Sequence, residues 1–73
     1  MDISKIISSL SWNKKIEVFR AINNWTQEEA ARKCKTNQKM YWSWEKGKNY
    51  PRKDSQISIA EAYGVNVKDI FPI

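Results

Sequence analysis

The sequence predicts an all-α protein organised around a central helix-turn-helix, and three observations lead to this prediction. First, apolar residues recur at helical spacing in two short runs, separated by a polar break at residues 35–37. Second, Thr26 and Glu29 have the spacing of a capping box at the start of the first run. Third, Asn37 is placed to cap the second run, and Gly47 to end it in a left-handed conformation. Two short helices joined by such a bend form a helix-turn-helix.

The composition limits the classes of protein to which the chain can belong. Its 73 residues predict a single domain, residues 1–73. The single cysteine excludes an internal disulfide and fits a reducing compartment. The chain opens without a signal-peptide pattern, and no apolar run reaches the roughly 20 residues of a membrane span. We therefore expect a soluble, cytoplasmic protein without a membrane partner.

The residues that catalysis would need are missing from the sequence. The chain contains no histidine, no carboxylate dyad, no Gly-rich phosphate loop and no spacing typical of a metal site. Cys34 occupies an apolar position of a predicted helix, where a small core residue is expected rather than a nucleophile. We expect neither enzymatic activity nor a metal or other cofactor.

Positive charge is concentrated in the middle of the chain. From Arg32 to Lys53 there are eight Lys or Arg residues and one acid, Glu45, which is a net charge of +7. The whole chain carries +5, so the remainder carries −2. Because the charge coincides with the predicted helix-turn-helix, it favours a face that binds a polyanion over a merely solvated, Lys-rich surface.

The spacing of apolar residues predicts which side of each helix faces the core. The helix expected over residues 13–23 places inward Ile16, Phe19 and Ile22. The second helix of the motif buries Tyr41 and Trp44, which leaves on its outer face Gln38, Lys39, Trp42, Ser43 and Lys46. After Pro51, a helix ending at Gly64 places inward Ile57, Ile59, Ala60 and Tyr63. A closing turn of helix covers the core with Val65, Val67, Ile70 and Phe71.

Residues 1–11 form either an N-terminal arm or an extra helix. Within them, one face of a short helix would collect Ile3, Ile6, Ile7 and Leu10. If this face packs on its own domain, it extends the core. If it stays exposed, it is a contact for a second subunit or for another protein.

These residues, in this register, resemble the Cro/repressor-type helix-turn-helix family, also called the XRE family. The most specific matches are Thr-Gln-Glu-Glu at residues 26–29, Trp-Glu-x-Gly-x-x-x-Pro at residues 44–51 and Ile-Ala-x-Ala-x-Gly-Val at residues 59–65. The resemblance covers about residues 16–71 and implies a five-helix, lambda-repressor-like DNA-binding domain. The chain departs from the family pattern at the bend, where Lys35 and Thr36 replace a glycine and an aliphatic residue. A non-Gly residue with positive φ costs about 1 kcal/mol, so a reshaped bend is one outcome.

The resemblance also implies which residues touch double-stranded DNA. Gln27 corresponds to the family glutamine that donates to a phosphate, beside the free amides of a helix N-terminus. The positions that read base edges in the major groove correspond to Gln38, Lys39 and Ser43. Their amide, ammonium and hydroxyl groups are chemically suited to that role.

Contacts to the DNA backbone are implied at and after the second helix of the motif. Asn37 is mainly a helix cap that also reaches a phosphate, while residues just past the helix lie along the backbone: Lys46, Lys48 and Asn49. Arg52 corresponds to a position that reaches either a narrowed minor groove or a phosphate.

Three further residues have a special position in the resemblance. Arg20 and Glu45 resemble a structural ion pair that ties the first helix to the end of the recognition helix. Trp42 is unusual, because the family has a small polar residue at that position. Its indole either packs along a deoxyribose, stacks at a subunit contact or rotates inward beside Met40.

The resemblance implies a transcriptional regulator similar to the small phage Cro repressors, bound as a homodimer to operator half-sites at the bacterial nucleoid. Ile70, Phe71 and Ile73 either form an apolar edge that the second subunit covers or cap the core. The alternative is a helix-turn-helix modulator of the antirepressor or antitoxin type, which acts mainly by binding a second regulator protein. Trp42 and the apolar residues within 3–10 keep this alternative open.

Overall fold

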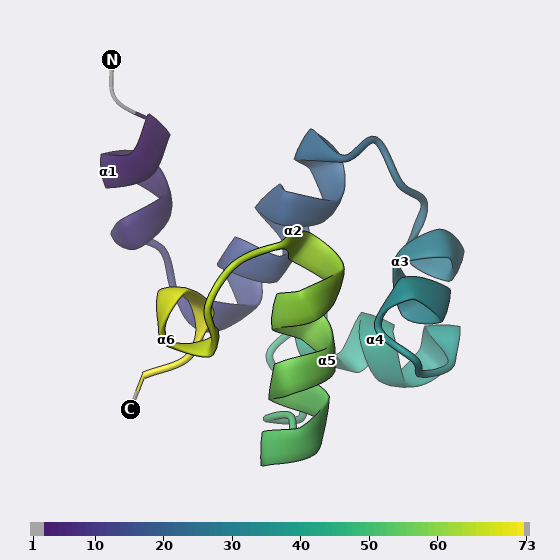
Figure 1. The fold of residues 1–73 in the computed structure, drawn as a ribbon. Coiled ribbons are helices and arrows are strands. Elements are labelled where there is room, and N and C mark those ends of the chain that lie inside the picture. Colours follow the sequence, from purple (N-terminus) through teal and green to yellow (C-terminus); the bar gives the residue numbers. More distant parts are fainter. Residues whose placement is uncertain (1–2, 73) are drawn as a thin grey trace.

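The computed structural model describes residues 3–72 of the chain, which form six helices joined by short turns (Figure 1). The helices are α1 (Ile3–Ser8), α2 (Trp12–Ile22), α3 (Gln27–Lys33), α4 (Gln38–Glu45), α5 (Lys53–Tyr63) and α6 (Val67–Ile70). The prediction of an all-α fold with a central helix-turn-helix is confirmed, with α3 and α4 as its two helices. Five of the six helices correspond to those expected, and α1 is the additional one.

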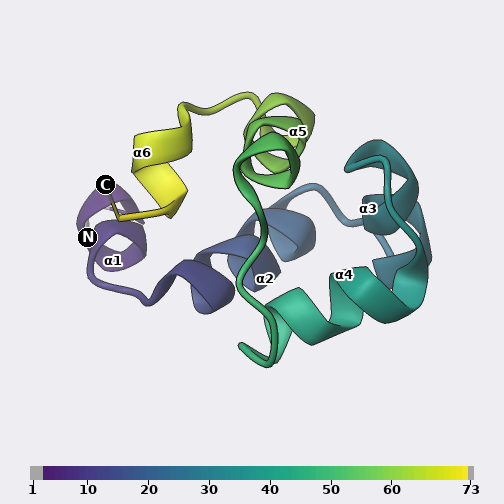
Figure 2. The same cartoon turned by 90° about the horizontal axis from the view of Figure 1, so that it is seen from below.

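The helix-turn-helix lies at one end of the molecule, and the first and last helices, α1 and α6, lie at the other (Figure 1 and Figure 2). In Figure 1 and in Figure 2, α3 and α4 are on one side, whereas α1 and α6 are on the opposite side. Helix α2 connects the two ends, since it packs against α1, α4 and α6, while α5 packs against α3 and α6. Helix α4 is thus supported by α2 and α3, and Figure 2 shows it along the outer edge of the molecule.

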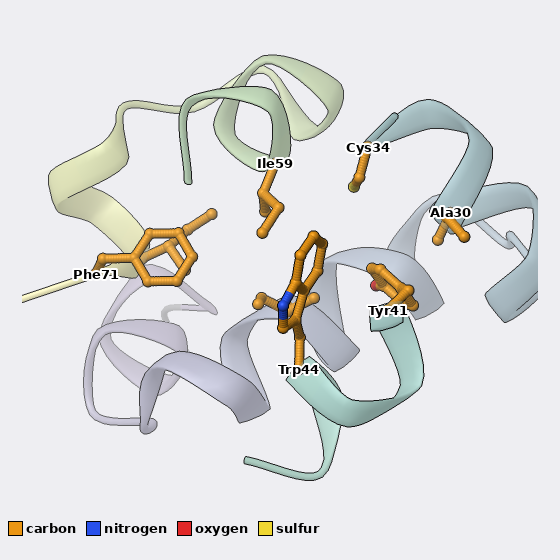
Figure 3. Packing of buried hydrophobic residues seen from close by; sticks show 9 residues of the cluster. Ala30, Cys34, Tyr41, Trp44, Ile59 and Phe71 are labelled. Atoms are coloured by element: carbon orange, nitrogen blue, oxygen red, sulfur yellow. The ribbon is translucent and has the colours of Figure 1, made fainter. Parts of the chain in front are cut away.

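Helix α4 is held in place by two aromatic side chains on its inner face. Tyr41 and Trp44 are buried in the core, as predicted, where they meet Ile16 of α2 and Ile59 of α5 (Figure 3). Phe71, which follows α6, closes the same cluster from the other side. The inner face of α4 therefore packs in the core, and the other side chains of this helix lie outside that cluster.

Helices α2 to α5 all end with a residue in the left-handed conformation; in order, these are Asn24, Lys35, Gly47 and Gly64. At the end of α4, the amide of Lys48 donates to the carbonyl of Ser43 (2.9 Å) and that of Gly47 to the carbonyl of Trp44 (3.0 Å). These two bonds define a Schellman motif, which satisfies carbonyls that the helix leaves free.

The bend between α3 and α4 uses the same motif without a glycine. Lys35 has a φ of 61°, and the amides of Thr36 and Lys35 donate to the carbonyls of Ala31 (2.9 Å) and Arg32 (3.1 Å). The chain thus keeps a left-handed residue at this position although a side chain makes that conformation costly. The departure from the family pattern leaves the bend in place.

Two residues predicted to face the core are exposed instead. Ile22 is 60% exposed and Ile57 is 48% exposed, so both predictions are wrong. Helical geometry explains each case, because residues advance by about 100° along a helix. Ile22 lies about 240° around α2 from the buried Ile16, and Ile57 lies about 200° around α5 from the buried Ile59.

The C-terminal segment covers the core of its own domain. Ile70 and Phe71 are almost completely buried, and the amide of Phe71 donates to the carbonyl of Val67 (2.8 Å). Of the two alternatives for these residues, the exposed edge for a second subunit is therefore wrong, and the role of capping the core is confirmed. Ile73 lies outside the described residues.

Helix α1 packs on α2, with Ile7 and Leu10 half-buried and Ile6 exposed. A hollow between α1, α2 and the C-terminal segment is lined by apolar side chains that include Ile7, Phe19 and Val65. The N-terminal helix therefore packs on its own domain with part of its apolar face, while Ile6 stays exposed.

Candidate nucleic-acid interface

The outer face of α4 begins with two polar side chains that point to solvent. Gln38 and Lys39 form the first turn of the helix, and both are exposed. Asn37 caps this turn, because its Oδ1 accepts a hydrogen bond from the amide of Met40 (2.7 Å). The cap fixes the start of α4, so the two side chains leave the protein from a defined position.

Ser43 is buried rather than exposed on this outer face, contrary to the prediction. The residue is only 7% exposed, and its hydroxyl donates to the carbonyl of Met40 (2.6 Å). The cause is the turn after Gly47, which brings the chain back over the last turn of α4, so that the amide of Lys48 bonds the carbonyl of Ser43. The hydroxyl is thus used within the helix rather than offered to a ligand.

Glu45, on α4, connects this helix to the two helices that hold it in place, α2 and α3. Its carboxylate accepts from Arg20 of α2 at two points, from Nε to Oε2 (2.6 Å) and from a terminal guanidinium nitrogen to Oε1 (3.2 Å). The same Oε1 accepts from Nε2 of Gln27, the first residue of α3 (3.1 Å). The hydrogen bonds to Glu45 raise the pKa of Arg20 above its ordinary value. The structure therefore contains the expected ion pair, and Gln27 joins it.

Asn13 is a positioning residue that sequence reasoning missed. Its side-chain amide donates to the carbonyl of Glu45 (3.1 Å) at the end of α4. A Cβ atom at Gly47 would approach Nδ2 of Asn13 to 3.3 Å, and Gly47 has a φ of 71°. A glycine is thus favoured at residue 47, because a side chain there would be strained in this conformation and would crowd Asn13. No local pattern marks Asn13, because its partner is 32 residues away.

The charged groups around α4 are almost all positive at the surface. Every Lys and Arg between residues 32 and 53 is exposed, whereas Glu45, the acid in this stretch, is buried against Arg20. The exposed residues that follow α4 include four of the predicted contacts, namely Lys46, Lys48, Asn49 and Arg52. The burial of Glu45 removes its charge from the face, so the surface is more cationic than the sequence count indicates.

Trp42 is on the outside of α4, 39% exposed, so the alternative in which its indole rotates inward is wrong. The ammonium of Lys48 lies over the indole, 5.5 Å from the ring centroid. This distance is typical of a cation–π contact. The two side chains come from α4 and from the turn after it, so the contact joins both parts of the exposed face.

Among the described residues, no cluster of three His, Cys, Asp or Glu side chains could hold a metal ion. The thiol of Cys34 is buried, and this burial raises its pKa to about 12, so it is protonated at neutral pH. None of the described helices is long and apolar enough to cross a membrane.

A short helix with one exposed face, packed against two others and surrounded by Lys and Arg side chains, is typical of a helix-turn-helix domain. The family model described as Helix-turn-helix matches residues 16–70 of the chain. An uncharacterized HTH-type transcriptional regulator from Methanocaldococcus jannaschii is 37% identical over 57 residues, which cover 78% of this chain and 86% of that protein. No solved structure matches the chain.

The chain therefore belongs to the XRE-type helix-turn-helix family. The domains of this family bind DNA in regulators of transcription, and the exposed face of α4 is consistent with DNA binding.

Proposed function

We propose that the protein is a sequence-specific transcriptional regulator similar to the small phage Cro repressors, which inserts α4 into the major groove of operator DNA. The observation that carries this proposal is the outer face of α4. Gln38 and Lys39 are exposed there, and so are the surrounding Lys and Arg side chains. Glu45, the acid between residues 32 and 53, is buried. A helix of this size fits the major groove, and its amide and ammonium groups match base-edge acceptors and donors.

The proposed contacts divide into two classes. Gln38 reads adenine through its amide, and Lys39 donates to O6 or N7 of guanine. The residues proposed to contact phosphates are Gln27, Asn37, Lys46, Lys48 and Asn49, whereas Arg52 reaches either a phosphate or the minor groove. Gln27 uses one amide hydrogen on Glu45, and its second remains available for a phosphate. Ser43 is left out of the base contacts because of its burial.

The regulator acts as a homodimer on DNA in this proposal. One short recognition helix contacts only a few base pairs, so two copies related by a two-fold axis are needed for a specific operator. Their half-sites are then spaced by about one helical turn of DNA, roughly 34 Å. Binding of such a dimer across a promoter represses transcription by excluding RNA polymerase.

The test is a selection of preferred duplexes from a randomised pool with the full chain, followed by a footprint at physiological salt. The proposal predicts nanomolar binding and protection of two related half-sites about one turn apart. Weak binding without sequence preference would contradict it. If preference emerged only after a second regulator protein was added, the result would favour the modulator function instead.

A further inference from the structure

Helix α4 presents an apolar surface in the middle of its otherwise polar outer face. Trp42 is exposed there, and Met40 beside it is 41% exposed. Both side chains line a hollow of about 430 Å³, whose wall also includes Asn37, Lys39 and Lys48. The apolar surface thus lies among the side chains proposed to contact DNA.

The indole of Trp42 is contacted by Lys48, and hydrogen bonds fix the backbone of the residues around it. The ammonium of Lys48 lies 5.5 Å from the ring centroid, and the amide of Lys48 is fixed to the carbonyl of Ser43 (2.9 Å). The backbone of Met40 is fixed as well, since its amide donates to Asn37 and its carbonyl accepts from Ser43. The cation–π contact favours this position of the ring, and a ring that is already placed loses less freedom on binding.

The charge around the hollow favours DNA over a protein as its occupant. Lys39 and Lys48 line the hollow, and Lys46 is exposed one residue past the end of α4. Glu45, the acid between residues 32 and 53, is buried. Such a surface attracts a phosphate backbone to the surroundings of the indole. Base edges in the major groove offer one distinctly apolar group, the 5-methyl group of thymine.

We propose that Trp42, with Met40 beside it, contacts the 5-methyl group of a thymine and so sets the sequence preference at that base pair. The inference rests on the proposed function, because it requires that α4 lies in the major groove. It adds an apolar contact to the polar base contacts of Gln38 and Lys39. Because a methyl group is uncharged, this part of the specificity does not depend on salt.

The experiment replaces each thymine of the selected duplex, one at a time, with deoxyuridine, which differs only in lacking the methyl group. For the unmodified protein, one replacement is expected to weaken binding by about four-fold, the effect of one buried methyl group. The same factor is expected at low and at high salt. For Trp42→Ala, binding to the thymine duplex weakens by about ten-fold and the effect of deoxyuridine disappears.

Ile57→Ala is the matched control, because Ile57 is a similarly exposed apolar residue on α5. It is expected to keep both the affinity and the full effect of deoxyuridine. Thermal unfolding of Trp42→Ala and of Ile57→Ala checks that both variants are folded. Trp42→Phe keeps an aromatic ring and is expected to retain part of the effect.

The possible results separate this inference from the proposed function. If a preferred duplex is found but no thymine responds to deoxyuridine, the inference fails while the proposed function stands. An undiminished response in Trp42→Ala also overturns it, since another residue would then contact the methyl group. If no preferred duplex emerges, the proposed function fails and the inference fails with it.

Discussion

At the scale of single residues, Glu45 determines how α4 is held. Its side chain is bonded to Arg20 of α2 and Gln27 of α3, and its backbone carbonyl to Asn13. The family resemblance predicts the pair with Arg20, but the bonds from Asn13 and Gln27 leave no mark in the sequence. Their partners are 32 and 18 residues away, so only the folded chain brings them together.

Glu45→Ala is expected to lower the free energy of unfolding by about 3 kcal/mol, because it leaves the mostly buried guanidinium of Arg20 without its carboxylate. Chemical denaturation at pH 7 measures the change. The control is Glu17→Ala, which removes an exposed pair with Lys14 (3.3 Å) and should change stability by less than about 1 kcal/mol. Equal effects of the two substitutions on the free energy of unfolding would show that the bonds to Glu45 do not stabilise the fold more than an exposed ion pair does.

At the scale of the element, the start of α3 shows how a local pattern becomes a stable helix. The amide of Thr26 donates to Oε1 of Glu29 (3.0 Å), and the amide of Glu29 donates to Oγ1 of Thr26 (3.1 Å). The capping box that the spacing predicts is therefore present. Its bond from the Thr26 backbone lowers the pKa of Glu29 below the ordinary value.

This shift predicts a dependence of stability on pH. Since the pKa of Glu29 is lower in the folded state, its ionised carboxylate stabilises the fold above the unfolded pKa, near 4.5. That contribution disappears as the pH falls through the lower, folded pKa. Urea unfolding of the wild type and of Glu29→Gln should therefore differ at pH 7 and converge at low pH. A difference in the free energy of unfolding that stays constant from pH 7 to low pH would show that the ionised carboxylate of Glu29 is not the stabilising group.

The bend between α3 and α4 predicts a stabilising substitution. Lys35 has a φ of 61° and is exposed, so its side chain makes few contacts that a glycine would lose. Lys35→Gly relieves the left-handed strain but increases the freedom of the unfolded chain, for a net gain of up to about 1 kcal/mol. Lys35→Val should be destabilising, because a β-branched residue is poorly tolerated there. Thermal unfolding of both variants tests the order of stability.

At the scale of the whole molecule, the helix order and the main core were predictable, whereas several surface details were not. Caps and helical spacing identify α3 and α4 because both signals lie within a few residues. The burial of Ser43 was not predictable from the spacing, since it arises when the chain returns over α4 after Gly47. The exposure of Ile22 and Ile57, in contrast, follows from helical spacing alone, because both lie far around their helix from its buried residues.

Burial in the core is expected to protect Cys34 from thiol reagents. Cys34 is almost completely buried, and this burial raises its pKa to about 12. We expect a thiol reagent at pH 8 to label the native protein far more slowly than the chain unfolded in guanidinium chloride. Labelling as fast as in the unfolded chain would mean that the core around α3 opens readily.

In the proposed function, α4 reads DNA through its outer face while the residues after it bind the DNA backbone. The direct measurement compares Gln38→Ala with Lys46→Ala on the selected duplex and on its single-base variants, across a range of salt concentrations. Gln38→Ala should cost about 1–3 kcal/mol, lose the preference at one base pair and keep the salt dependence. Lys46→Ala should weaken binding to all sequences and reduce the slope of log affinity against log salt by about one. If the two variants behaved alike, the assignment of α4 as the recognition helix would be contradicted.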